Sequence, residues 1–479
     1  MFYILLAVFV FAILATYITT KIIFKNNREK FHAIIMKLLK IFAVAYCVII
    51  FLTVLLPDGF TISYDKEDLF LSSKTTLYAI VRWFSILSFI MLPIAVFFKN
   101  RTIRNIAIYF CTIMCIISAC FYNTHIAYFT SQSGRGLNSI SVLSTSAKAF
   151  LLNPTFRSIF FGFSLGLGFV IPVILTIEEK HVFDYKNYKE YLSFFLVLIF
   201  SLLSCIPIYI PQHFFGHTNI LFDAWTPPHF IWMALVVVEL IVLYFVFRNK
   251  DYESKNILCL VLSLSMAFQF FQLFGAMTIS MKKMPFQLCN IATFLVLFSI
   301  ITKNKKLFDF TMIVNVVGAI FALATPDLDG EGLCYLYNIE FICEHTNIII
   351  VPILALLFKL FPRINKNALK NCFIGFAIYF IVIWILGTTL NSIASYTQND
   401  FYNANYFFIF DKDVAIKLLP FLSGVFDITI TIGSHIVLYP VVAIAVYGVF
   451  NFACLLIYLL IQLIYKIKDK KNKLKTVEN

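Results

Sequence analysis

A cysteine and a histidine in the C-terminal half of the chain are of the types that perform nucleophilic chemistry. Cys289 follows Pro285, Gln287 and Leu288, and His345 follows Glu344. A thiol attacks as its thiolate, and a nearby imidazole helps to remove the proton. The pair could therefore exchange an ester through a thioester. The alternative is a buried structural cysteine and a histidine bonded to a backbone carbonyl.

The two residues lie near the ends of predicted membrane spans. Proline suits the first turn of a helix, so Pro285 places Cys289 about one turn inside a span. A second span ends at Thr325, and a third is approached through Glu340 and His345. We expect these ends at a similar depth on one side of the membrane. The polar residues there are candidates for binding a substrate: Gln287, Asn290, Thr325 and Asp327.

Two other groups of polar residues could bind ions. His213, His217, Asp223 and His229 surround the start of one span, and the first two would share a face of a helix, as metal ligands often do. The acidic segment 326–344 could ligate a hard cation through oxygen. Interfacial polar residues and a solvated acidic loop are the simpler interpretations, and we predict no metal site and no cofactor.

Glu239 stands in the middle of a predicted span. An acid at that depth is costly and is by default a hypothesis of function. It could be protonated and hydrogen-bonded, or it could lie on a proton or cation path. Elsewhere, Cys334 and Cys343 lie in or beside a predicted outer loop and form either a disulfide or two unpaired thiols. The sequence lacks the motifs of P-loop ATPases, dinucleotide enzymes, zincins and ordinary serine hydrolases.

The composition shows what must position these residues. Apolar and aromatic residues make up 61% of the 479 residues and charged residues 13%, whereas soluble domains carry roughly 25% charged residues. A spanning helix needs about 20 apolar residues. We predict an all-α polytopic membrane helical bundle with thirteen spans: 2–24, 34–56, 77–98, 103–122, 157–177, 191–210, 229–247, 257–275, 285–302, 307–325, 346–361, 371–390 and 434–465.

The basic residues predict the orientation. The net charge is +13, and 27 of the 38 Lys and Arg lie in alternate loops, including the one after the last span. Basic loops stay in the cytoplasm. The N-terminus is therefore predicted outside and the C-terminus inside, and the charge indicates a cell membrane rather than nucleic acid. High Phe, Ile, Lys and Asn usage favours a bacterial source.

The chain divides into three predicted parts. Residues 1–221 form a six-helix membrane module, 222–465 a seven-helix domain and 466–479 a basic cytoplasmic tail. Similar basic leads at 97–101 and 301–305 are a weak indication of two degenerate repeats with a register of 204 residues. The alternative is two unrelated basic loops, which are common between helices. The longest outer stretches are 122–156 and 391–433, and apolar patches in the second lie at the interface or re-enter the membrane.

Residues 222–465 resemble the YwaF-type integral membrane proteins. The resemblance rests on short stretches in the family's order: 227–229, 284–289, 322–328, His345 and 405–408. Gln287 departs from the family, in which many members have histidine, and a glutamine cannot act as a base. The six preceding spans are also additional to the family pattern.

The resemblance implies an activity, because a eukaryotic branch of this family is regarded as Cys-dependent phospholipid acyltransferases. It implies that Cys289 is the nucleophile, His345 the base and His229 a further polar member of the site. The leading hypothesis is therefore acyl transfer at the outer leaflet, with membrane lipids as partners and a lysolipid or a lipid-modified protein as acceptor. The alternatives are a transporter or lipid flippase that uses Glu239, and a non-catalytic membrane scaffold.

Overall fold

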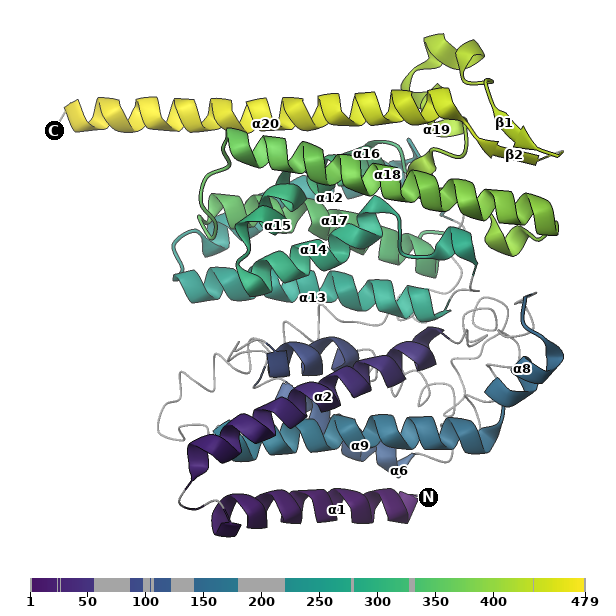
Figure 1. The fold of residues 1–479 in the computed structure, drawn as a ribbon. Coiled ribbons are helices and arrows are strands. Elements are labelled where there is room, and N and C mark those ends of the chain that lie inside the picture. Colours follow the sequence, from purple (N-terminus) through teal and green to yellow (C-terminus); the bar gives the residue numbers. More distant parts are fainter. Residues whose placement is uncertain are drawn as a thin grey trace. The chain divides into compact units, whose positions relative to one another are not determined.

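The protein is an all-α multi-pass membrane protein. The structure is a computed structural model that describes residues 2–23, 25, 27–55, 87–97, 104, 107–121, 142–179, 220–276, 280–326, 332–433 and 435–477. Within these ranges nine helices are long and apolar enough to cross a membrane, and the sheet that they contain is a single two-stranded hairpin (Figure 1). This confirms the class that the composition predicts.

The chain forms two compact units. Unit 1 comprises residues 1–216 and 267–279. In its described part, α9 (Pro154–Glu179) contacts most of the other helices, because its apolar residues occur all around the helix. The other elements of unit 1 are α1 (Phe2–Ile18), η1 (Thr19–Ile23), α2 (Arg28–Leu55), the helix Leu87–Phe97, η3 (Ala107–Cys111), α6 (Thr112–Cys120) and α8 (Thr145–Leu151).

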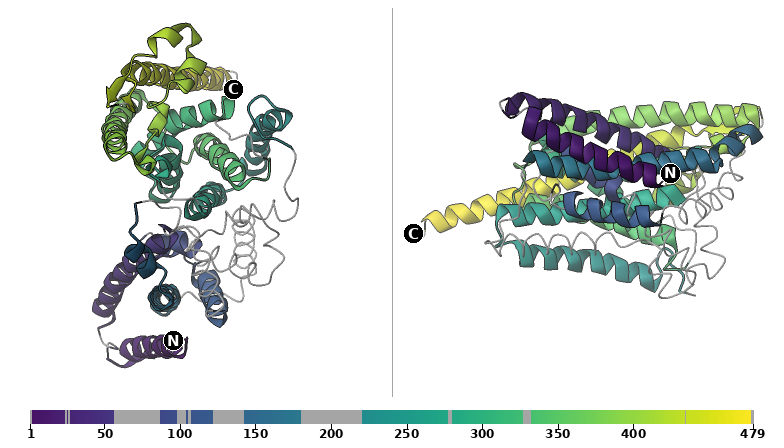
Figure 2. Two further views of the ribbon diagram at one scale, coloured as in Figure 1. Left: turned by 90° about the vertical axis from the view of Figure 1, so that its right-hand side faces the viewer. Right: turned by 90° about the horizontal axis from the view of Figure 1, so that it is seen from below.

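Unit 2 comprises residues 217–266 and 280–479 and contains the candidate site. Its long helices run side by side, as two views show (Figures 1 and 2). They are α12 (Pro227–Phe247), most of α13 (Tyr252–Ala276), α14 (Leu288–Thr302), α17 (Leu336–Leu357), α18 (Lys366–Thr397), α20 (Pro440–Val477) and a rod made of α15 (Lys305–Phe310), the π turn η5 (Thr311–Asn315) and α16 (Val316–Ala324).

Where the chain is described, the predicted spans overlap helices, with two corrections. The span predicted at 434–465 begins in the strand His435–Leu438, and its helix, α20, starts at Pro440. The span predicted at 346–361 is α17, which begins ten residues earlier, at Leu336. Its first turns carry Glu340, Glu344 and His345, which lower the local hydropathy. These side chains are nevertheless buried, since α12, α14 and α16 pack around α17. The predicted span 191–210 lies outside the described residues.

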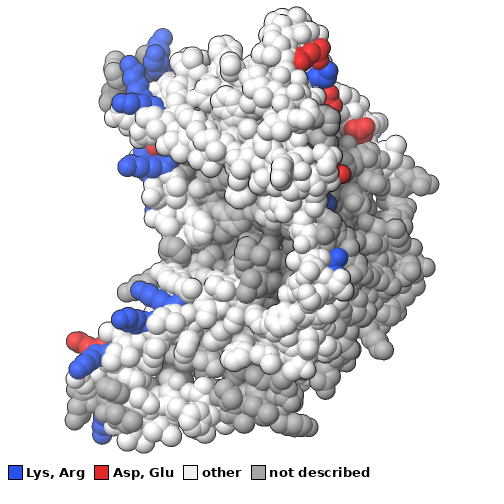
Figure 3. All heavy atoms as spheres, turned by 45° about the vertical axis from the view of Figure 1, so that its right-hand side comes forward, with Lys and Arg blue, Asp and Glu red and all other residues white. Residues whose placement is uncertain are grey.

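Charged side chains of unit 2 separate toward its two ends. Many of the visible Lys and Arg lie at the end where α20 leaves the bundle, whereas the acidic side chains at the opposite end are accompanied by a few basic ones (Figure 3). At the basic end, Arg363 donates two hydrogen bonds, of 2.8 and 2.7 Å, to the Asp469 carboxylate. The loops predicted to be cytoplasmic therefore share one end of this unit.

The segment between α18 and α20 folds back onto the helices. It contains η6 (Asp400–Tyr402), η7 (Tyr406–Phe408), α19 (Asp413–Leu418), η8 (Pro420–Val425) and the hairpin of β1 (Ile430–Ile432) and β2 (His435–Leu438). Strand partners are Ile430 with Leu438 and Ile432 with His435, and the turn uses Gly433 at φ +61°. The composition did not predict this hairpin.

An aromatic cluster fixes the segment to the bundle. The Phe407 ring lies 5.5 Å from Phe376 of α18 and 5.1 Å from Phe450 of α20, measured between centroids. Tyr406 and Ile409 are fully buried. The part of the segment around 405–410 is therefore a component of the core of unit 2.

Two helix glycines allow a test of how closely the segment between α18 and α20 packs against these helices. A Cβ at Gly387 of α18 would lie 2.3 Å from the ring of Phe410, whereas a Cβ at Gly448 of α20 would meet nothing within 4 Å. We expect Gly387→Ala to lower the free energy of unfolding by about 1–3 kcal/mol through overpacking. Thermal unfolding of the purified protein measures this change.

The matched control is Gly448→Ala. It should leave stability unchanged or raise it by up to about 1 kcal/mol, because alanine is the better helix former. Equal effects of the two substitutions would contradict the close packing of Phe410 against α18.

Candidate functional site

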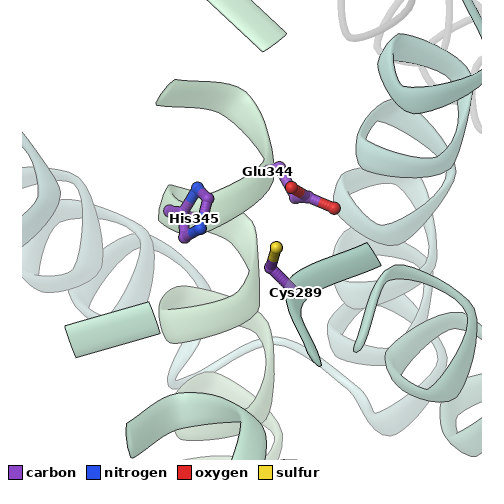
Figure 4. A group of neighbouring side chains, drawn as sticks. All are labelled: Cys289, Glu344 and His345. Carbon is purple, nitrogen blue, oxygen red and sulfur yellow. The ribbon is translucent and has the colours of Figure 1, made fainter. Parts of the chain in front are cut away.

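Three reactive side chains meet between α14 and α17. Cys289 lies in the first turn of α14, and Glu344 and His345 lie in the middle of α17. The Cys289 sulfur, a Glu344 carboxylate oxygen and a His345 ring nitrogen all lie within 4.8 Å of one another. Figure 4 shows the sulfur directed toward α17, between the other two side chains. We call these residues the Cys289 trio.

The helices place the trio by simple periodicity. Pro285 cannot continue a hydrogen-bonded helix from upstream, so α14 starts just after it, at Leu288. Residues three or four apart share a helix face, so Cys289 and Thr293 both face α17. The Thr293 hydroxyl donates a 2.7 Å hydrogen bond to Glu344. The carboxylate is thereby held beside the thiol.

The hydrogen bonds of His345 define its tautomer. Nδ1 lies 2.8 Å from the backbone oxygen of Phe341, one turn earlier in α17. A carbonyl oxygen only accepts, so Nδ1 carries a proton, and in the neutral ring Nε2 presents a lone pair. The Phe341 ring lies 4.1 Å from the imidazole and restricts its rotation. In its neutral form, His345 can therefore accept a proton or a metal ion at Nε2.

Glu344 of the trio belongs to a row of buried polar side chains along α17. Glu340, Glu344 and Asn347 follow one another at helical spacing and are each at least nine-tenths buried. Within the part of the chain that the structure describes, Glu340 Oε1 and Asn347 Oδ1 have no hydrogen-bond partner. Among the described residues neither glutamate forms an ion pair. Two carboxylates at close range and low dielectric cannot both keep an uncompensated charge, so this row requires a proton or a cation.

Gln287 joins the start of α14 to the segment after α18. Its amide nitrogen donates to the Asn405 backbone oxygen at 2.8 Å, and its amide oxygen accepts from the Phe407 backbone nitrogen at 2.7 Å. Phe407 has a left-handed φ of 56°, which is strained for a phenylalanine. Gln287, which lies two residues before the nucleophile candidate Cys289, thus stabilises a strained turn at Phe407.

His229 makes a similar connection at the start of α12. Its Nδ1 accepts from the Trp225 backbone nitrogen at 3.0 Å, and its Nε2 donates to the Leu323 backbone oxygen at 2.7 Å. The side chain is fully buried. Both ring nitrogens are occupied by backbone groups, so the histidine ties α12 to the end of α16 and is not one of the trio.

The remaining predicted site residues occupy different places. Asn290 accepts a 3.4 Å contact from the Cys289 thiol, and Thr325 bonds to the Phe321 carbonyl at the end of α16. Glu239 is half-buried two turns beyond Trp232 on α12, outside the trio. Asp223 is exposed and bonds to the Ala224 backbone nitrogen. Three predicted residues lie outside the described ranges: Asp327, His213 and His217.

Sequence analysis missed two members of the site. Glu344 was placed in an acidic loop, and Thr293 was not considered. The four-residue spacing between Cys289 and Thr293, and between Glu340 and Glu344, is the signal that could have revealed a shared face. Cys334 and Cys343 are unpaired thiols. The second of these lies within α17 rather than in a loop.

The Gln287 bonds lead to a stability prediction. Gln287→Ala removes the side-chain partner of the Asn405 carbonyl and of the Phe407 N–H, which are both part-buried. Leaving a fully buried polar group unsatisfied costs about 1–3 kcal/mol, so the cost here should lie toward the lower end. We expect a lower unfolding temperature and faster proteolysis within 399–412. The control is Gln462→Ala, which removes one bond to the Ile364 carbonyl and should leave that proteolysis unchanged. Unchanged proteolysis in Gln287→Ala would contradict the connection.

Comparisons with known proteins address unit 2. No curated protein and no solved structure matches the chain. One family model matches residues 224–458, a range that contains the trio and lies within the predicted 222–465. The resemblance to YwaF-type proteins remains a prediction. In the range 224–458 the chain is similar to the TMEM164 family, which is a family of membrane proteins.

Proposed function

We propose that this protein transfers acyl groups between lipids through a thioester on Cys289. The observation that carries the proposal is the proximity of the thiol to both an imidazole nitrogen and a carboxylate oxygen, all within 4.8 Å of one another. A nucleophilic cysteine needs a neighbouring base, and the base needs a group that orients it. His345 supplies the base, and the Phe341 carbonyl orients it.

The steps follow from these positions. The Cys289 thiol passes its proton to Nε2 of His345 as the sulfur attacks the ester carbonyl of a phospholipid. The ester bond breaks, the lysophospholipid oxygen takes the proton, and an acyl thioester remains on Cys289. An acceptor hydroxyl then gives its proton to His345 and attacks the thioester, and the released sulfur recovers the proton.

The surroundings suit a lipid substrate. Cys289 is partly exposed, whereas Glu344 and His345 are 2% exposed, so the thiol is the member that a substrate would meet first. The similarity to a membrane-protein family and the acyltransferase activity implied by the sequence resemblance support the proposal. The predicted orientation places the site near the outer leaflet.

The test is intact-mass analysis after incubation with an acyl-labelled phospholipid. We expect an acyl adduct on the wild-type protein, none on Cys289→Ala, and formation at least about a hundredfold slower in His345→Gln, since a lost general base costs about 10²–10⁴-fold. Cys334→Ala and Cys343→Ala are matched controls that should keep the adduct.

Two outcomes would contradict the proposal. One is an adduct that persists in Cys289→Ala. The other is a folded wild-type protein that forms no adduct and turns over no lipid.

A further inference from the structure

We propose that the Cys289 trio also binds a zinc ion, and that the zinc-bound form cannot carry an acyl group. Metal binding itself goes beyond the proposed function. The inhibition rests on that function, because it requires Cys289 to be the nucleophile.

The donor set is the first argument. The trio offers one sulfur, one oxygen and one nitrogen, all within 4.8 Å of one another. Zinc binds such ligands at about 2.0–2.3 Å and commonly uses three protein ligands with an open fourth position. Tetrahedral ligands at those lengths lie roughly 3–4 Å apart. Small side-chain rotations would therefore bring the trio onto an ion.

The hydrogen bonds behind the ligands are the second argument. A metal-bound histidine almost always donates its other ring N–H to a carbonyl or carboxylate. His345 Nδ1 already donates to the Phe341 carbonyl, and Thr293 already holds Glu344. Two of the three ligands are thus oriented before an ion arrives, and the free atom of the histidine is Nε2.

Charge is the third argument. Glu344 is 2% exposed and Glu340 4% exposed, and neither has an ion pair among the described residues. Zinc, a Cys289 thiolate and a Glu344 carboxylate sum to zero net charge, which a low-dielectric interior tolerates. As the zinc–sulfur bond forms, the thiol proton leaves to bulk water. The thiolate favours zinc over calcium or magnesium, which prefer all-oxygen sites.

Zinc and the acyl group would compete for one sulfur atom. A zinc-bound thiolate is no longer free to attack an ester, and zinc on Nε2 also removes the base. The trio would therefore be a zinc-sensitive switch on the same chemistry. In the opposite direction, an acylated Cys289 would lack the sulfur ligand and should bind zinc weakly.

The experiment uses the full-length protein in detergent, stripped with a chelator and dialysed against Zn²⁺, with bound metal measured by elemental analysis. We expect about one zinc per wild-type chain and at least about tenfold weaker binding in Cys289→Ala, Glu344→Gln and His345→Gln. Cys343→Ala and Glu239→Gln change the same residue types outside the trio and should bind as the wild type does.

A second measurement guards against variants that fold poorly. Co²⁺ in place of zinc gives a near-ultraviolet thiolate-to-cobalt absorption, which should be present in the wild type and Cys343→Ala and absent in Cys289→Ala. Either of two results would overturn the inference: no such absorption in the wild-type protein, or zinc binding retained in Cys289→Ala.

The two proposals fail separately. Zinc binding by the trio, together with no acyl adduct on the chelator-stripped protein, would support the metal site and refute acyl transfer. The opposite result is a protein that forms the acyl adduct but binds no zinc, with added zinc leaving the rate of adduct formation unchanged. It would refute the metal site and keep acyl transfer.

Discussion

The burial of charged and polar side chains in α17 is the constraint on which the rest of unit 2 depends. Exposing Glu340, Glu344 or His345 to lipid would cost several kcal/mol each. The bundle avoids this cost because α12, α14 and α16 surround α17. α12 turns its apolar side chains outward, and most of them are exposed, as expected for a helix that separates a polar interior from lipid.

Holding that arrangement requires connections at the helix ends, where backbone groups lack helical partners. His229 joins α12 to α16 through the Leu323 carbonyl, and Trp232 donates to Thr346 of α17 at 2.9 Å. Gln287 joins α14 to the segment that carries Phe407. These bonds link positions about a hundred residues apart. The reactive trio therefore rests on several long-range contacts rather than on its own two helices alone.

The tautomer of His345 determines which reactions the trio could support. Because Nδ1 donates to a carbonyl, Nε2 is available as a proton acceptor or as a metal ligand. Acyl transfer and zinc binding need the same lone pair and the same sulfur. One geometry therefore supports both proposals and makes them mutually exclusive at any moment, which is the physical basis of the competition between acyl group and ion.

The sequence by itself determined the class of this protein, because composition and the length of apolar runs are local properties that the bilayer constrains directly. Residue chemistry and short motifs also predicted Cys289 and His345 as a pair, and the structure brings their side chains within 4.8 Å. Tertiary structure decided where α17 begins, since hydropathy treats every helix as lipid-facing and α17 is not. It also decided the roles of Gln287, whose bonds reach 118 and 120 residues along the chain, and of Glu344. Those roles depend on which helices become neighbours, and no local pattern encodes that.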